Sequence, residues 1–117
     1  MSKLRIKRIY AAPAKSDGRR ILVDRLWPRG LTKEAAQIDH WAKAVAPSNE
    51  LRQWYGHDPA KWEEFRRRYF AELGRNEAAV AELRAQLGKG MNTLLFQSKE
   101  EEINNAQALK EYLEKQA

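Results

Sequence analysis

The sequence contains no cysteine, only two histidines and no long apolar run. Without cysteine the chain has no disulfide, no thiolate zinc site and no cysteine nucleophile. With so few histidines we expect neither a built-in metal nor a bound cofactor. No stretch approaches the roughly 20 apolar residues of a membrane-spanning helix, and the first residues lack the apolar segment of a signal peptide. These absences predict a soluble, cytoplasmic protein with no membrane partner.

Three signatures of common enzyme classes are also missing. The chain has no Gly-x-Ser-x-Gly nucleophile elbow, no phosphate-binding P-loop and no dinucleotide fingerprint. A candidate site must therefore be sought in other features. The length of 117 residues, with 43% hydrophobic and 32% charged side chains, suits one domain with one core. We expect residues 1–117 to form a single α/β domain, and the sequence leaves its oligomeric state open.

Positive charge is concentrated in the first third of the chain. Residues 1–33 hold ten lysines and arginines against two aspartates, whereas residues 34–117 hold twelve basic and fourteen acidic side chains. The overall charge of +6 thus comes from one end of the sequence. A local basic field attracts phosphates, carboxylates or nucleic acid without distinguishing among them.

Hydrophobic periodicity predicts alternating strands and helices. Apolar and β-branched runs predict strands over 4–10, 20–24 and 93–96, and capping residues with 3.6-residue periodicity predict helices over 32–46, 48–56, 58–74, 76–87 and from 104 onward. This order favours an α/β fold: a small, largely parallel sheet of about three or more strands covered by helices. The loop 11–19 is short for a parallel crossover, so an antiparallel first pair remains an alternative that would put Tyr10 and Asp24 at opposite ends.

The loop Asp24–Gly30 is the first candidate site, because it directly follows a buried strand. Ligands of parallel sheets bind at the carboxyl ends of the strands. Arg25 and Arg29 offer planar forks for a phosphate or carboxylate, and Trp27 between them offers a face for stacking a flat ring. We interpret the loop as an anion-binding site. In the alternative interpretation, Asp24 pairs with a neighbouring arginine and Trp27 only fills the core.

Two further residues are expected beside this loop. Trp54 lies in a short segment and is a candidate ligand wall, and His57 can exchange a proton near neutral pH. Asp24 and His57 are therefore the candidate catalytic residues, although His57 equally suits a hydrogen bond that fixes the turn before Asp58. Trp41 falls on an apolar helical stripe, for which core packing is the default.

The arginine run 66–68 has a structural explanation. Glu63, Glu64 and Glu72 stand at helical spacings from these arginines, which predicts a solvated, salt-bridged helix face. The run alone therefore does not indicate a nucleic-acid site.

A set of motifs distributed along nearly the whole chain resembles a known family. The motifs are Asp17-Gly18, Leu22-Val23-Asp24-Arg25-Leu26-Trp27-Pro28-Arg29-Gly30, Lys33, Trp41, Pro47-Ser48, Leu51-Arg52, Trp54, Gly56-His57-Asp58-Pro59, Trp62, Phe65, Tyr69 and Glu72-Leu73. They resemble the YeaO-like branch of the bacterial domain-of-unknown-function family 488. The resemblance implies a small bacterial α/β domain in which the Val-Asp-Arg strand end faces a polar loop, and it implies no reaction.

The chain departs from this resemblance before the last helix. Many relatives look like Lys-Asp followed by a His-Asn pair, where this chain has Lys99-Glu100 and then Ile103-Asn104-Asn105. A histidine at that position is therefore absent from this chain.

Three function classes remain open at the level of sequence. The first is a pocket for an anionic small molecule, a nucleotide or a phosphorylated or carboxylated metabolite, and turnover would make the protein an enzyme. The second is a nucleic-acid binder with phosphate contacts from basic residues of the first third: Lys3, Arg5, Lys7, Arg8, Arg19 and Arg20. The third is an interaction module without a ligand.

Overall fold

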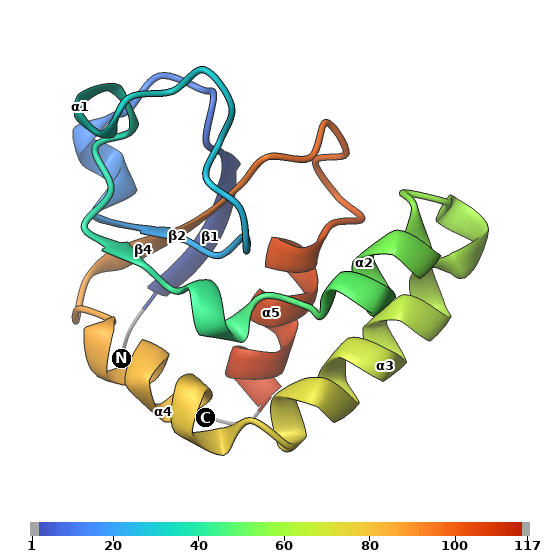
Figure 1. The fold of residues 1–117 in the computed structure, drawn as a ribbon. Helices are drawn as coiled ribbons and strands as arrows, with labels where there is room; N and C mark the ends of the chain where they lie inside the picture. Colours follow the sequence, from blue (N-terminus) through green and yellow to red (C-terminus); the bar gives the residue numbers. More distant parts are fainter. Residues whose placement is uncertain (1–2, 116–117) are drawn as a thin grey trace.

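Residues 3–115 are described by the computed structural model, and they contain one four-stranded sheet flanked by helices. The strands are β1 (Lys3–Arg8), β2 (Arg19–Leu22), β3 (His40–Trp41) and β4 (Met91–Phe96). Their order is β1-β4-β2-β3, and every neighbouring pair is parallel (Figure 1). The prediction of a small, largely parallel sheet is confirmed.

The first two strands do not pair with each other, because β4 lies between them and is parallel to both. The connection 9–18, which includes the 3-10 turn Lys15–Asp17, crosses from one side of β4 to the other. The antiparallel alternative is therefore wrong. Tyr10 and Asp24 follow strands of the same direction, and the Tyr10 hydroxyl donates to the Arg29 carbonyl at 3.0 Å.

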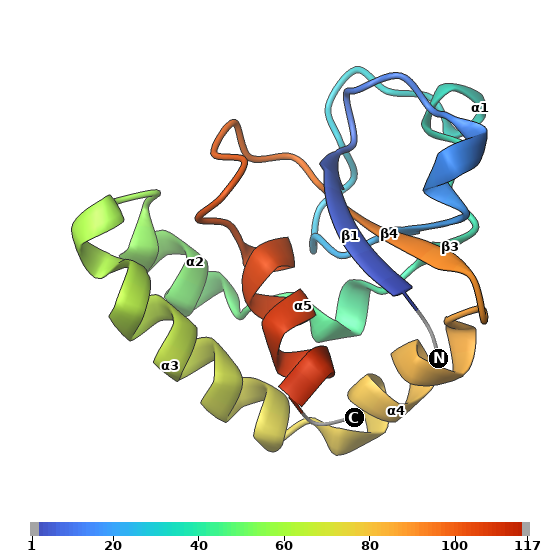
Figure 2. The same ribbon diagram turned by 180° about the vertical axis from the view of Figure 1, so that it is seen from behind.

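Four helices cover one face of the sheet (Figure 1, Figure 2). They are α2 (Asn49–Tyr55), α3 (Trp62–Gly74), α4 (Glu77–Gln86) and α5 (Asn105–Lys115). Alternate residues of a strand point to opposite faces, so Ile21 and Leu94 reach this side and meet Phe65 and Tyr69 of α3. This larger core fixes the helices against the sheet.

The opposite face carries a smaller core. Leu22 and Leu95 point to this side and pack with Ala36 of the short helix α1 (Lys33–Ala36). Trp27 and Trp41 close the cluster, with ring centroids 5.4 Å apart in an edge-to-face arrangement. The loop that begins at Asp24 is thereby attached to the sheet by its tryptophan.

The predicted helix over 32–46 is wrong beyond its first turn. Thr32 caps it as expected, because its hydroxyl accepts from the Ala35 amide at 3.1 Å. Helix α1 then ends at Gln37, whose φ of 47° lies in the left-handed region. The strand β3 and a 3-10 turn, Lys43–Val45, follow instead of further helix.

The open edge of β2 explains why residues 38–46 do not continue the helix. The Asp39 amide donates to the Arg20 carbonyl at 2.7 Å, and the Ala42 amide donates to the Leu22 carbonyl at 2.8 Å. These bonds satisfy strand groups that a helix would leave unpaired. Trp41 and the later apolar residues have the spacing expected of one helix face. In the structure, however, Trp41 packs on the smaller core, and the 3-10 turn that follows packs on the larger core.

The caps around α2 confirm the predicted boundaries and place the helix beside the sheet edge. The Ser48 hydroxyl accepts from the Leu51 amide at 3.1 Å, and α2 ends at Gly56 with φ 52°. The Asp58 carboxylate then accepts from the Ala60 amide at 3.0 Å and begins the next helical segment. Between residues 3 and 115, no helix has the length and apolar character needed to cross a bilayer.

Candidate functional site

The carboxyl ends of the strands share one edge, where the connections after the two central strands diverge. The chain after β2 leads to α1 beside the smaller core, and the chain after β4 leads to α5 beside the larger core. In open parallel sheets, the point where neighbouring connections leave to opposite faces forms a crevice that binds ligands. The topology thus predicts a ligand site in the space between Asp24 and the segment after Phe96.

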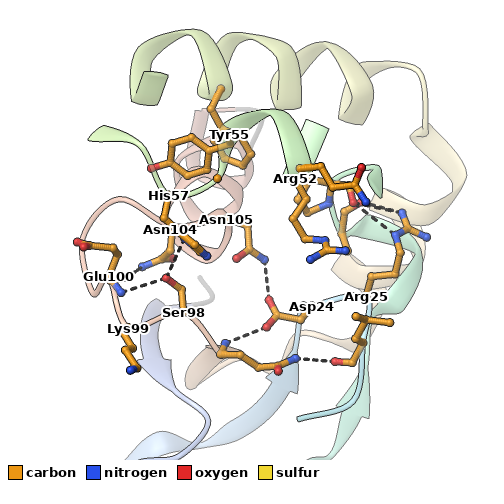
Figure 3. A pocket seen from close by; sticks show the side chains of 17 residues that line it. Asp24, Arg25, Arg52, Tyr55, His57, Ser98, Lys99, Glu100, Asn104 and Asn105 are labelled. Atoms are coloured by element: carbon orange, nitrogen blue, oxygen red, sulfur yellow. Dashed lines mark hydrogen bonds between the residues drawn. The ribbon is translucent and has the colours of Figure 1, made fainter. Parts of the chain in front are cut away.

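A cavity of about 690 Å³ occupies this place (Figure 3). Its lining comes from the loops after β2 and β4, the segment before α2, the end of α2, and the first residues of α5: Asp24, Arg25, Leu26, Ala46, Pro47, Arg52, Gln53, Tyr55, Gly56, His57, Phe65, Gln97, Ser98, Lys99, Glu100, Asn104 and Asn105. Apolar side chains supply much of this wall and polar groups converge from several elements, as in typical small-molecule sites.

Asp24 lies at the centre of the polar lining. Its carboxylate accepts from the Asn105 side-chain amide at 2.9 Å and from the Gln97 backbone amide at 2.8 Å (Figure 3). Its carbonyl accepts from the Trp41 indole at 2.7 Å, which fixes the residue from behind. Burial raises the pKa of the Asp24 carboxyl, although hydrogen bonds from Asn105 and from the backbone and side chain of Gln97, together with the charge of Arg52, act in the opposite direction.

Three cationic side chains line the cavity, and they differ in their partners. Arg25 donates from Nη2 to the carbonyls of Ala46 at 3.2 Å and Pro47 at 3.4 Å, so it holds the segment that leads into α2. The side chains of Arg52 and Lys99 are exposed and, within residues 3–115, have no hydrogen-bond or ion-pair partner. These two cations are therefore available to a ligand.

His57 lies at the rim, near the loop that follows β4 (Figure 3). Its φ of 59° places a non-glycine residue in the left-handed region. Its Nδ1 is 3.4 Å from the Ser98 hydroxyl oxygen, which also accepts from the Glu100 amide at 3.0 Å. In the described part of the chain, no group of three or more His, Asp or Glu side chains is placed to hold a metal ion.

The cavity brings together only some of the residues that the sequence nominated. Asp24, Arg25 and His57 line it, whereas Trp27, Arg29 and Trp54 do not. Trp27 packs in the smaller core and its indole donates to the Leu31 carbonyl at 2.6 Å.

The other two nominated residues also lie outside the cavity lining. Arg29 is exposed. Trp54 is on α2, where the Arg68 guanidinium lies 4.2 Å and the Lys61 ammonium 5.1 Å from its ring centroid. The ring of this tryptophan is thus contacted by two cationic side chains of the protein.

Several lining residues escaped sequence-based nomination. Arg52, Ser98, Lys99 and Asn105 were not nominated as site residues, because only the packing of α2 and α5 against the sheet edge brings them to Asp24. One signal was present for Ser98 and Lys99, which directly follow the central strand β4, as Asp24 follows β2. Residues after adjacent parallel strands meet at the same edge.

The basic first third of the chain is largely used inside the fold. Asp17 is fully buried and accepts from Arg5 at 2.6 Å, from Lys7 at 2.9 Å and from Arg20 at 2.6 Å. Arg8 donates to the backbone carbonyl of Ser98 at 2.9 Å. Arg5, Lys7, Arg8 and Arg20, which the sequence offered for phosphate contacts, are therefore engaged by protein acceptors.

Ion pairs account for the arginine run 66–68, as predicted. The three arginines pair with carboxylates of their own helix and of α5: Glu63, Glu64 and Glu111. Glu72 differs from the expectation, because its carboxylate accepts from the Ser48 hydroxyl at 2.6 Å and from the Ser48 amide at 2.9 Å. It supports the start of α2 beside the cavity.

Comparison with known proteins places the chain in a family. A family model described as the inactive DUF488-N3 subclade matches residues 3–117. The chain is 39% identical to the uncharacterised protein YeaO of Escherichia coli over 110 residues, 94% of this chain and 96% of that protein. It is 45% identical to the uncharacterised protein Rv3073c of Mycobacterium tuberculosis over 92 residues, 79% and 77% of the two chains. No solved structure matches. The chain belongs to the DUF488 family of bacterial proteins and is a YeaO-like member of it.

Proposed function

We propose that the cavity at the strand ends binds a small anionic molecule, a nucleotide or a phosphorylated or carboxylated metabolite. The observation that carries this proposal is the convergence of Arg52 and Lys99, from two separate elements, on one cavity where neither has a protein partner among residues 3–115. Phosphate and carboxylate oxygens are the natural acceptors for such unpaired cations. Arg25 adds positive potential beside them, and His57 adds a further hydrogen-bonding group.

The dimensions and walls of the cavity suit a ligand of this class. A volume of about 690 Å³ lies within the roughly 300–1,000 Å³ range of small-molecule sites. Leu26, Pro47 and Phe65 supply an apolar wall beside the cations. Such a wall accommodates a ring or short chain attached to the anionic group, so we favour an organic anion over a bare inorganic one.

Binding without turnover is the form of this proposal that agrees with the family description, which names the subclade inactive. Asp24 and His57 remain the candidate proton-transfer residues, but Asp24 is engaged by Asn105 and by the Gln97 amide. The histidine that many relatives carry before the last helix is absent from this chain. We therefore assign these two residues to ligand contact.

The nucleic-acid alternative has less support, because Arg5, Lys7 and Arg20 surround the buried Asp17. An affinity for nucleic acid that falls steeply with salt would revive it, since phosphate contacts release counterions. The interaction module without a ligand is the alternative that the following experiment separates from our proposal.

Thermal unfolding measured against a panel of nucleotides, sugar phosphates and carboxylates tests the proposal. A ligand at 100 times its Kd stabilises the folded state by about 2.7 kcal/mol, which raises Tm by several degrees. Arg52→Gln should remove most of the rise. Arg75→Gln, a matched change at an exposed arginine outside the cavity, should keep it. Arg25 is unsuitable as the first variant, because it also holds the Ala46 and Pro47 carbonyls. A panel that leaves Tm unchanged would contradict the proposal.

A further inference from the structure

The Asp24 carboxylate faces the cavity with acceptor capacity left over. A carboxylate has about four lone-pair positions, and here Asn105 occupies one on Oδ1 and the Gln97 backbone amide one on Oδ2, while the Gln97 side-chain amide also stabilises the charge. No lysine, arginine or histidine of residues 3–115 forms an ion pair with it. The nearest residue in sequence, Arg25, directs its guanidinium to the Ala46 and Pro47 carbonyls instead.

The surroundings hold this carboxylate in a fixed orientation. The Asn105 amide that donates to Asp24 also donates to the Val23 carbonyl at 3.2 Å, so its position is set by the strand end as well as by the carboxylate. The Trp41 indole fixes the Asp24 backbone. The acceptor capacity that remains on Asp24 thus has a defined direction before any ligand arrives, which lowers the cost of recognising a donor.

The electrostatics of the cavity favour a ligand with two kinds of group. A partly buried carboxylate without a cation loses hydration that its amide partners only partly replace. In the view of Figure 3, Asp24 lies between Arg52 on one side and Lys99 on the other. Within the described chain, one cavity therefore presents two cationic side chains without an ion pair and the carboxylates of Asp24 and Glu100, of which Asp24 is the one held by Asn105 and Gln97. A simple anion would pair with Arg52 and Lys99 but would give the Asp24 carboxylate no donor.

We propose that the ligand carries, besides its anionic group, an N–H donor group that Asp24 accepts. This inference rests on the proposed function of the cavity and names its ligand class: an anion with an ammonium group or a nucleobase amine. Arg52 and Lys99 contact the anionic group, and the fixed carboxylate of Asp24 selects for the donor.

Isothermal titration of the full chain with two matched ligand pairs tests this selection. Phosphoethanolamine and n-propyl phosphate differ by an ammonium in place of a methyl group, and GMP and IMP differ by one exocyclic amine. A hydrogen bond to a charged acceptor corresponds to about tenfold in affinity. The wild-type protein should bind the donor member of at least one pair about tenfold more tightly. Preference in the first pair alone assigns an ammonium, and preference in the second alone assigns a nucleobase amine.

Variants attribute the preference to Asp24. Asp24→Asn, a nearly isosteric change, should reduce the ratio to within about twofold while the member that lacks the ammonium or the exocyclic amine binds at least as well as before. Glu101→Gln removes one exposed negative charge outside the cavity and should keep the ratio. If Asp24→Asn does not fold, the wild-type ratio still tests whether the site selects a ligand with a donor, and equal affinities would overturn the inference.

The outcomes separate this inference from the proposed function. Equal affinity for both members of each pair, with binding that Arg52→Gln abolishes, would overturn the inference and leave the anion site standing. A ratio that survives Asp24→Asn would also overturn it. Failure of all four ligands to bind would contradict the inference, and the wider thermal panel would then decide the proposed function.

Discussion

Two aspartates, one before and one after strand β2, show how differently the same side chain is used. Asp17 is fully buried among Arg5, Lys7 and Arg20, all within ion-pair distance. Asp24 lies beside a cavity, accepts from two amides and has no ion pair in the described chain. The Asp17 carboxylate forms ion pairs that join elements of the protein to each other. The Asp24 carboxylate has no ion pair in the described chain and can still accept a hydrogen bond from a ligand.

The pKa directions follow this contrast. Burial opposes ionisation of Asp17, but hydrogen bonds from Lys7, the Ala14 amide and Arg20 outweigh it and lower its pKa to about 2. Burial raises the pKa of Asp24, where only amides and the more distant Arg52 charge oppose it. Ionisation is therefore stabilised at the first site and penalised at the second. The predictions below test this difference.

Removing the charge of Asp17 should have the largest effect. Asp17→Asn leaves three cations around a neutral side chain, and Arg20 is almost completely buried. Breaking a buried ion pair in this way destabilises by about 3–5 kcal/mol. Urea unfolding should show a loss of this size, and Asp24→Asn measured in parallel should show far less. Equal losses for the two variants would remove the distinction between the sites.

Acid should weaken the fold through Asp17. A carboxyl whose pKa is lowered on folding contributes stability above its unfolded pKa of 3.8, and that contribution disappears as the pH falls toward 2. A shift of this size corresponds to about 2 kcal/mol. Unfolding free energies of the wild type and of Asp17→Asn should therefore converge between pH 4 and pH 2. Parallel curves through this window would count against the assigned ion pairs.

Removing one of the three cations should have a moderate effect. Lys7→Met deletes the ammonium that contacts both Asp17 oxygens at 2.9 and 3.0 Å, while Arg5 and Arg20 remain. We expect a loss of about 1 kcal/mol in urea unfolding, because two charge partners still compensate the carboxylate. A loss as large as that of Asp17→Asn would mean that the ammonium alone supports the cluster.

Neutralising Asp24 should have the smallest effect on stability, with the opposite pH dependence. A raised pKa means that the contribution of the carboxyl is fully present below its unfolded pKa and is lost as the pH rises through the folded value. Asp24→Asn lacks this loss, so it should remain within about 1 kcal/mol of the wild type and gain relative stability from pH 4 to pH 7. A relative decline over this range would contradict the assigned direction.

Local chemistry made much of the fold predictable. Thr32, Ser48 and Asp58 were recognisable as caps because a cap depends on the amides of the next turn. The two-residue strand β3 was not predictable, because it forms on the free edge of β2 and its apolar spacing imitates a helix. Tertiary pairing overrode the local pattern there.

Residues of the candidate site could be predicted from the sequence only where they lie close to the end of a predicted strand. Asp24 and Arg25 follow β2 directly, and the cavity contains both. Arg52 and Asn105 reach the same cavity from α2 and α5, and nothing in their local sequence specifies that meeting. Trp27 was a candidate because it belongs to the same loop as Asp24. Its side chain instead packs on the smaller core, since its large apolar surface is better buried against Trp41.

The most direct test of the account is a titration of the isotopically labelled protein with GMP or phosphoethanolamine, followed by two-dimensional NMR of the backbone amides. We predict chemical-shift changes concentrated at residues 24–25, 52–57 and 97–105, with the amides around Asp17 unchanged. Changes centred on Asp17 and its three cations, or no change at any amide with either ligand, would contradict the claim that the cavity beside Asp24 is the binding site.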